Sequence, residues 1–168
     1  MTFRLSVPFA AHFAALFAAA TLAGFATLAQ AQVPVYGTNV NIDQARKAVA
    51  GAVADARKQN LPMAIAIVDT AGQLVAFERM DNTQTASTMI AQDKAVSAAM
   101  LRRSTKVLQD GLAQGGANLR FLALRYAVPI EGGLPIIVDG KIIGGIGVSG
   151  GSSDQDGVVA KAGLDAMK

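Results

Sequence analysis

The glycine-rich segment from Pro129 to Gly151 constrains the fold of this chain more than any other stretch. Two apolar runs, 134–138 and 142–148, flank the dipeptide Asp139-Gly140. Asp-Gly between β-branched residues favours a type I′ turn, because both central residues of that turn need a positive φ. The segment is therefore predicted to form a β-hairpin.

Glycine is far more frequent in this segment than one turn requires, with eight glycines between Gly132 and Gly151. A residue without a side chain lets another backbone approach closely. We therefore expect a neighbouring element, a second subunit or a ligand to lie directly against the hairpin, and we look for function there first.

The first 31 residues have the pattern of a secretory signal peptide. Arg4 precedes a long uncharged run, and the run ends at Ala29-Gln30-Ala31, which fits the small-x-small rule for cleavage. Cleavage would leave a single domain, residues 32–168, in the periplasm or secreted. The alternative is an uncleaved membrane anchor, since 7–31 is about long enough to span a bilayer, which takes ~20 residues.

Removal of residues 1–31 takes away His12 and Arg4, which leaves 14 basic residues against 12 acidic ones and no His or Cys. A near-neutral domain with scattered basic residues does not favour a nucleic-acid partner. Without Cys and His the usual zinc, copper and iron–sulfur ligand sets are missing, as are disulfides and the usual general base. About 137 residues suit one core, and no membrane contact is expected after cleavage.

Hydrophobic spacing places a second hairpin at 63–77, with a turn at 69–72. Helices are predicted at 42–59, 87–103, 104–112 and 154–167, with Ser87 as one N-cap and Ser152 or Ser153 as another. Alanines at 91, 95, 98 and 99 leave one helix face thin, which favours dense packing. Helices that alternate with hairpins in this order predict an α+β domain.

Two catalytic motifs occur in the hairpin but lack their partners. Gly145 to Gly150 matches the dinucleotide fingerprint G-x-G-x-x-G, yet only 18 residues follow, too few for a returning strand. Gly147 to Gly151 matches the nucleophile elbow around Ser149, yet no histidine remains as its base. We interpret Ser149 and its glycines as a tight connection from strand to helix.

Two further polar groups are candidate binding sites. Backbone N–H groups of the glycine-rich turn ahead of a helix make a possible anion site, although Asp154 and Asp156 already bring negative charge there. The second group follows the first hairpin and consists of Arg79, Asp81, Ser87 and Lys94. From the residues alone, a solvated loop with a capped helix is the favoured interpretation of this group. Glu131, beside Gly132-Gly133, is a third polar point.

Several strings together resemble one known family. They are DTAGQLVAFERMD, a following Ser-Thr-x-Ile-Ala-x-x-Lys-Ala helix, and Pro-x-x-Gly-Gly-x-Pro-Ile-x-x-Asp-Gly-x-x-x-Gly-x-Ile-Gly-Val-Ser-Gly with Gln155-Asp156 behind. Over about 42–168 the chain resembles the GlcG/HbpS-like haem-binding (haem-degrading) family. The resemblance implies a profilin-like α+β fold, with a five-stranded antiparallel sheet and helices on both faces.

The resemblance also implies a homo-oligomer, from tetramer to octamer, and haem as cofactor with a possible degrading or redox-sensing role. No axial ligand transfers to this sequence by motif. The open choices are a tyrosine, a methionine, a lysine or a hydroxyl, represented by Tyr126, Tyr36, Met80, Met89, Thr83, Thr85 and Thr88. Haem propionates are expected to meet Arg79, Lys94 or Arg120.

Three hypotheses follow. The first is an exported, oligomeric haem-binding protein. The second is an enzyme or accessory factor for a small carboxylate, with the glycine backbone as an anion cradle and with Ser149 and Glu131 nearby. The third is a structural assembly module, which requires the glycine-rich and alanine-rich faces to be buried between subunits.

Overall fold

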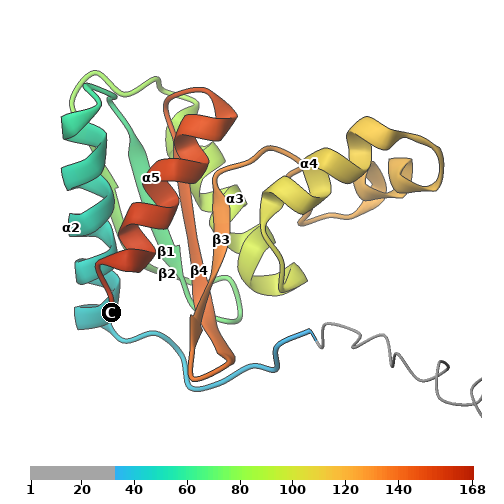
Figure 1. Ribbon diagram of the computed structural model, residues 1–168, viewed down its shortest axis with the longest axis horizontal. Coiled ribbons are helices and arrows are strands. Elements are labelled where there is room, and N and C mark those ends of the chain that lie inside the picture. The colour runs from blue at the N-terminus through green and yellow to red at the C-terminus, as the bar shows by residue number, and fades with distance from the viewer. Residues whose placement is uncertain (1–32) are drawn as a thin grey trace, which may run out of the picture. The chain divides into compact units, whose positions relative to one another are not determined.

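Both predicted hairpins form in the computed structural model, which describes residues 33–168, and together they make one antiparallel sheet (Figure 1). The strand order is β2-β1-β4-β3. Asp139 and Gly140 have φ of 49° and 71°, as the predicted type I′ turn requires. The elements are α2 (Ile42–Lys58), β1 (Ala64–Val68), β2 (Leu74–Arg79), α3 (Ser87–Leu101), α4 (Thr105–Gln114), the 3-10 helix η1 (Gly116–Ala123), β3 (Gly133–Val138), β4 (Lys141–Ser149) and α5 (Ser153–Asp165).

Helices cover both faces of the sheet, so the predicted α+β class is confirmed. α2 and α5 lie side by side on one face, and α3 lies on the other (Figure 1). Asn41 and Ser152 cap α2 and α5, each in a capping box with a glutamine. Ser87 does not act as the expected cap of α3, because it is the first residue of the helix, Ala86 holds the N-cap position and the Ser87 side chain is buried.

The sheet has four strands, so the expected five-stranded sheet is wrong. The segment 33–41 contributes only an isolated parallel bridge, Tyr36 to Ile142, in place of a fifth strand. Pro34 and Gly37 both disfavour a regular strand, because proline lacks a donor and glycine packs no side chain. The profilin-like classification stays a prediction.

The two faces of the sheet carry side chains of different size, because neighbouring strand residues point to opposite faces. Toward α2 and α5, β1 and β4 present Ile65, Ile67, Ile146 and Val148. Toward α3, β1 presents Ala64 and Ala66, which pack on the helix alanines. The core is therefore thick on one side of the sheet and thin on the other.

Glycines of β4 complete the thin side. A Cβ added to Gly147 would overlap the carbonyl oxygen of Ala91, and one added to Gly145 would lie 2.5 Å from the carbonyl oxygen of Ala95. Both oxygens belong to the backbone of α3, which therefore sits directly on the sheet. The neighbouring element expected against the hairpin is this helix.

The free edge of β3 offers few backbone donors. Val148 donates its N–H to the carbonyl of Gly132, and bonding residues alternate along an antiparallel strand, so Gly133 and Pro135 face the free edge. The Gly133 N–H is taken by the Thr105 hydroxyl at 2.9 Å, and proline has no N–H. This edge is consequently protected against pairing with another strand.

A buried ion pair ties α3, β4 and α5 together. Lys94 Nζ donates to Asp156 Oδ2 at 2.7 Å and to the Val148 carbonyl at 3.1 Å, and Asp156 Oδ1 accepts from the Gly151 N–H at 2.9 Å. Lys94 is 1% exposed and Asp156 3%. Burial raises the pKa of the Asp156 carboxyl above its usual range, and the Lys94 ammonium opposes that shift.

The segment 105–130, which we call the arm, projects from the rest of the described residues (Figure 1). It comprises α4, η1 and the chain that leads to β3. Only Thr105 and Leu108 of α4 are buried, and η1 buries no residue. Phe121 holds the two helices together by packing on Gly111.

The signal-peptide prediction for 1–31 lies outside the described residues and stays a prediction. Within residues 33–168, no helix has both the length and the apolar character that a membrane crossing requires.

Replacement of Gly147 by alanine should lower the free energy of unfolding by about 3 kcal/mol, the upper end for an overpacked core, because the Ala91 backbone cannot move aside easily. Urea unfolding measures the change. Gly140→Asn, on the open hairpin turn where asparagine tolerates a positive φ, is the control and should stay within about 0.5 kcal/mol. Equal effects of the two changes would contradict the tight contact.

Replacement of Lys94 by methionine should cost about 3–5 kcal/mol, because it leaves the Asp156 carboxylate buried without its cationic partner. The double variant Lys94→Met, Asp156→Asn removes the orphan charge and keeps an acceptor for Gly151, so it should recover much of the loss. Urea unfolding of both variants tests this, and a double variant as unstable as the single one would speak against it.

Candidate functional site

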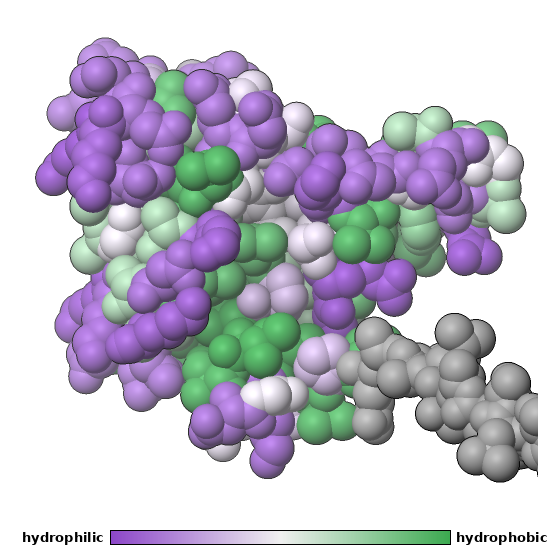
Figure 2. Space-filling view, in the orientation of Figure 1, coloured by the Kyte–Doolittle hydropathy of each residue, from purple (hydrophilic) through white to green (hydrophobic). Residues whose placement is uncertain are grey.

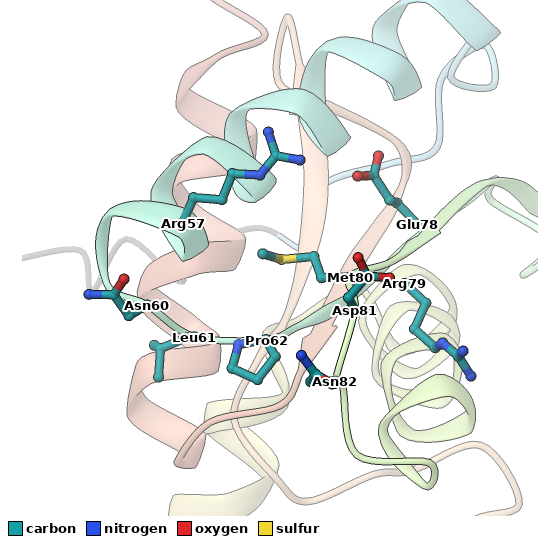
Figure 3. A pocket seen from close by; sticks show the side chains of 9 residues that line it. All are labelled: Arg57, Asn60, Leu61, Pro62, Glu78, Arg79, Met80, Asp81 and Asn82. Atoms are coloured by element: carbon teal, nitrogen blue, oxygen red, sulfur yellow. The ribbon is translucent and has the colours of Figure 1, made fainter.

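A polar cavity lies where α2 ends and β2 ends, with a volume of about 510 Å³. The chain from the end of α2 and the chain from the end of β2 form facing walls (Figure 3). Its lining residues are Arg57, Asn60, Leu61, Pro62, Glu78, Arg79, Met80, Asp81 and Asn82. The volume is within the about 300–1,000 Å³ typical of ligand pockets.

Two sharp backbone turns shape this cavity. Asn60 and Asn82 have φ of 55° and 62°, a left-handed conformation that asparagine tolerates better than most residues. Thr83 fixes the second turn, since its hydroxyl donates to the carbonyls of Met80 at 2.7 Å and Met63 at 3.1 Å. The Met80 N–H also bonds the Met63 carbonyl at 3.0 Å, which anchors the loop to β1.

Met80 and Arg57 line the cavity from two different elements. Figure 3 shows Met80 reaching toward α2 and Arg57 reaching back from the helix, while Arg79 extends away on the other side of β2. Strand alternation explains this, because Glu78 and Met80 share a face that Arg79 does not. Met80 is half-buried and packs against the main core.

The chemistry available in the cavity combines a soft thioether, a guanidinium and two carboxylates. A thioether is a soft ligand for a transition metal, and a guanidinium binds a carboxylate with two parallel hydrogen bonds. Among residues 33–168, no group of three or more His, Cys, Asp or Glu side chains is placed to hold a metal ion. A thioether and a guanidinium in one lining suit a ligand that carries a metal or anionic groups.

The structure separates the sequence-predicted site residues into four places. Arg79, Met80 and Asp81 lie at the polar cavity. Tyr126 lies on the arm and is exposed. Ser87 is buried at the start of α3. The rest lie at or near the buried ion pair, in α3 and at the ends of β3 and β4: Lys94, Glu131, Gly132, Gly133 and Ser149.

The expected anion cradle around the glycines already holds acceptors of the protein itself. Asp156 accepts from the Gly151 N–H, Thr105 from the Gly133 N–H, and Gln109 from the Glu131 N–H. Lys94, expected to reach a propionate, is instead buried against Asp156. An external carboxylate would have to displace these contacts.

Arg57 is the cavity residue that sequence reasoning missed. Arg57 lies in the last turn of α2, where a basic residue interacts favourably with the helix dipole. This structural role alone accounts for an arginine at that position, so the sequence did not indicate a binding residue. A left-handed asparagine just beyond a helix, here Asn60, is the one local signal that the chain turns back at this point.

A second, apolar groove of about 470 Å³ lies between β3 and the end of α5, where Figure 2 shows hydrophobic side chains beside a hydrophilic helix. Ile136, Leu164 and Met167 are among its walls. The lysines at its rim, Lys161 and Lys168, both pair with Asp165 and hold the pKa of that carboxyl at about 2. Their charge is thus partly neutralised within the protein.

Several known proteins are similar to this chain in sequence or in fold. GlcG of Escherichia coli K12 is 39% identical over 101 residues, which are 60% of this chain and 74% of GlcG. A crystal structure of HbpS has a TM-score of 0.71 at 30% identity and covers 78% of this chain and 92% of its own. A crystal structure of a PduOC:heme complex has a TM-score of 0.71 at 29% identity, covering 77% and 95%.

The family assignment depends on a match to most of the described residues. A family model described as haem degrading protein HbpS-like matches residues 40–165, a range that contains the sheet, the polar cavity and the arm. The expected resemblance is confirmed, and the chain belongs to the HbpS-like family.

Proposed function

We propose that this protein binds haem and that the polar cavity between α2 and β2 is the binding site. The observation that carries the proposal is that Met80 and Arg57 line one cavity, in a chain of the HbpS-like family. The PduOC:heme complex, similar in fold, supports haem as the ligand.

The residues present fit haem by their chemistry. Met80 offers a thioether as the axial ligand, a role methionine has in cytochromes c. Arg57 offers a guanidinium to a propionate, in place of the expected Arg79, Lys94 or Arg120. Leu61 and Pro62 supply apolar contact for the ring. Bound haem would supply redox chemistry, and a degrading role would rest on it.

Two other parts of the proposal come from the sequence. The signal-like residues 1–31 support export to the periplasm or beyond. The exposed apolar side chains of the arm support a homo-oligomer, from tetramer to octamer as in the expectation above. The second hypothesis, a small carboxylate in the glycine cradle, is not proposed because the protein's own acceptors fill that cradle.

A haem titration of the purified protein, followed by absorbance, tests the site. We expect saturable binding with a shifted Soret band, a different band position for Met80→Leu, and affinity about 10- to 100-fold weaker for Arg57→Gln. That loss corresponds to about 1.5–3 kcal/mol for a hydrogen bond to a charged group.

The controls separate the cavity from other places. Met167→Leu, in the apolar groove, and Arg103→Gln, an exposed arginine outside both cavities, should leave band and affinity unchanged. A spectrum that responds to Met167→Leu or to Tyr126→Phe but not to Met80→Leu would refute the cavity assignment. A titration without saturation would refute haem binding itself.

A further inference from the structure

The apolar groove between β3 and the end of α5 is lined by side chains that are continuous with the main core. Ile136 is 1% exposed, and Leu164 and Met167 pack against the buried cluster between the sheet and its two helices, α2 and α5. Val138 lies on the same face of β3 as Ile136, is 37% exposed and forms the outer part of the wall. The groove therefore opens directly onto the core of the domain.

The size and lining of the groove are those of a ligand site. Its volume of about 470 Å³ is within the about 300–1,000 Å³ typical of ligand pockets, which are mostly apolar and carry a few polar groups that select the ligand. Figure 2 shows hydrophobic side chains open to solvent beside the hydrophilic helix α5. This combination is typical of a site for a small molecule that is mostly apolar.

A strand of another chain is a poor occupant of this groove, because the edge of β3 offers few backbone donors. The Gly133 N–H bonds the Thr105 hydroxyl, and Pro135 has no N–H. Val138 is paired with Lys141 inside the hairpin. An added strand would lack most of the backbone hydrogen bonds that give such a complex its affinity. The groove is better matched to a ligand that needs no backbone partner.

The charged groups at the rim of the groove compensate one another. Lys161 and Lys168 both pair with the carboxylate of Asp165. The pKa of that carboxyl is held at about 2, so Asp165 is ionised at neutral pH. The carbonyl groups at the end of α5 add partial negative charge at the same place. An anion therefore gains little from the two lysines, and a cation gains little from the paired carboxylate.

From the apolar walls and the compensated rim, we propose that this groove binds an uncharged, mostly apolar small molecule of the alkyl or aromatic class. Asp165 sets the preference for an uncharged ligand over a carboxylate, because it occupies both lysines. The groove and the polar cavity share no lining residue, so this binding does not rest on the proposed function.

The test is displacement of Nile red, an uncharged dye, from the purified protein by alcohols of increasing chain length. We expect decanol to displace the dye with saturation, and each CH₂ group from hexanol to decanol to lower the Kd by about fourfold. Val138→Thr replaces a methyl group of the wall by a hydroxyl and should weaken decanol binding by about fourfold. Val158→Thr, the same change at an exposed position of α5 outside the groove, should not alter it.

A second variant tests the role of the rim. Asp165→Asn frees both lysines, so it should raise the affinity for decanoate by about fivefold, the effect of one unit charge at ~4 Å in water. The affinity for decanol should stay within about twofold. Asp154→Asn, a matched change in the first turn of the same helix, should leave both affinities unchanged.

Thermal unfolding without ligand checks each variant, and Val138 and Asp165 are both partly exposed, so the domain should stay intact. Dye that decanol does not displace, or displacement that Val138→Thr leaves unchanged, would overturn the groove as the site and leave it to another occupant, such as a second copy of the chain. Decanoate that binds no better after Asp165→Asn would overturn the role of Asp165. Loss of decanol binding in haem-loaded protein would overturn the separation of this groove from the haem site.

Discussion

The contact between α3 and the sheet is the constraint on which the other packing depends. A helix normally stands away from a sheet by the thickness of two layers of side chains. Here alanines on α3 and β1 meet glycines on β4, so the helix backbone lies against the strand backbone. Dispersion falls steeply with distance, so this contact is strong only while no side chain larger than alanine intervenes.

The same closeness explains the buried ion pair. Because α3 is near the sheet, the Lys94 ammonium reaches both the Val148 carbonyl near the end of β4 and Asp156 at the start of α5. A Cβ at Gly132 would lie 2.8 Å from Lys94 Nζ, so the glycine leaves the space that the ammonium fills. Residues that the sequence indicated as candidate binding residues therefore join α3, β4 and α5.

Local rules were sufficient for most of the fold. The Asp-Gly turn, the capping asparagine and serine, and the alternation of large and small residues each fix one element from its neighbours in sequence. The prediction of a fifth strand was wrong because strand pairing depends on a partner that is distant in sequence. Here only Tyr36 pairs, in a single bridge with Ile142. Ser87 failed as a cap because Ala86 already has helical dihedrals.

The candidate site was predictable only in part, for a related reason. Arg79, Met80 and Asp81 are consecutive and stood out as a polar loop, but Arg57 comes from another element and joins them only through the tertiary fold. Glycine density pointed to a ligand cradle, whereas the space it creates is used by α3 and by Asp156.

The polar groups without a partner in the domain therefore do not lie in the glycine-rich hairpin, where the sequence is most unusual. In the glycine-rich hairpin, backbone donors and charged groups find partners inside the domain. Among residues 33–168, carboxylates without an ion pair and a half-buried thioether remain at the end of α2 and β2, and arginines without an ion pair remain on the arm with exposed leucines. In the proposed function a ligand covers the first group, and in the proposed homo-oligomer a second copy of the chain covers the second.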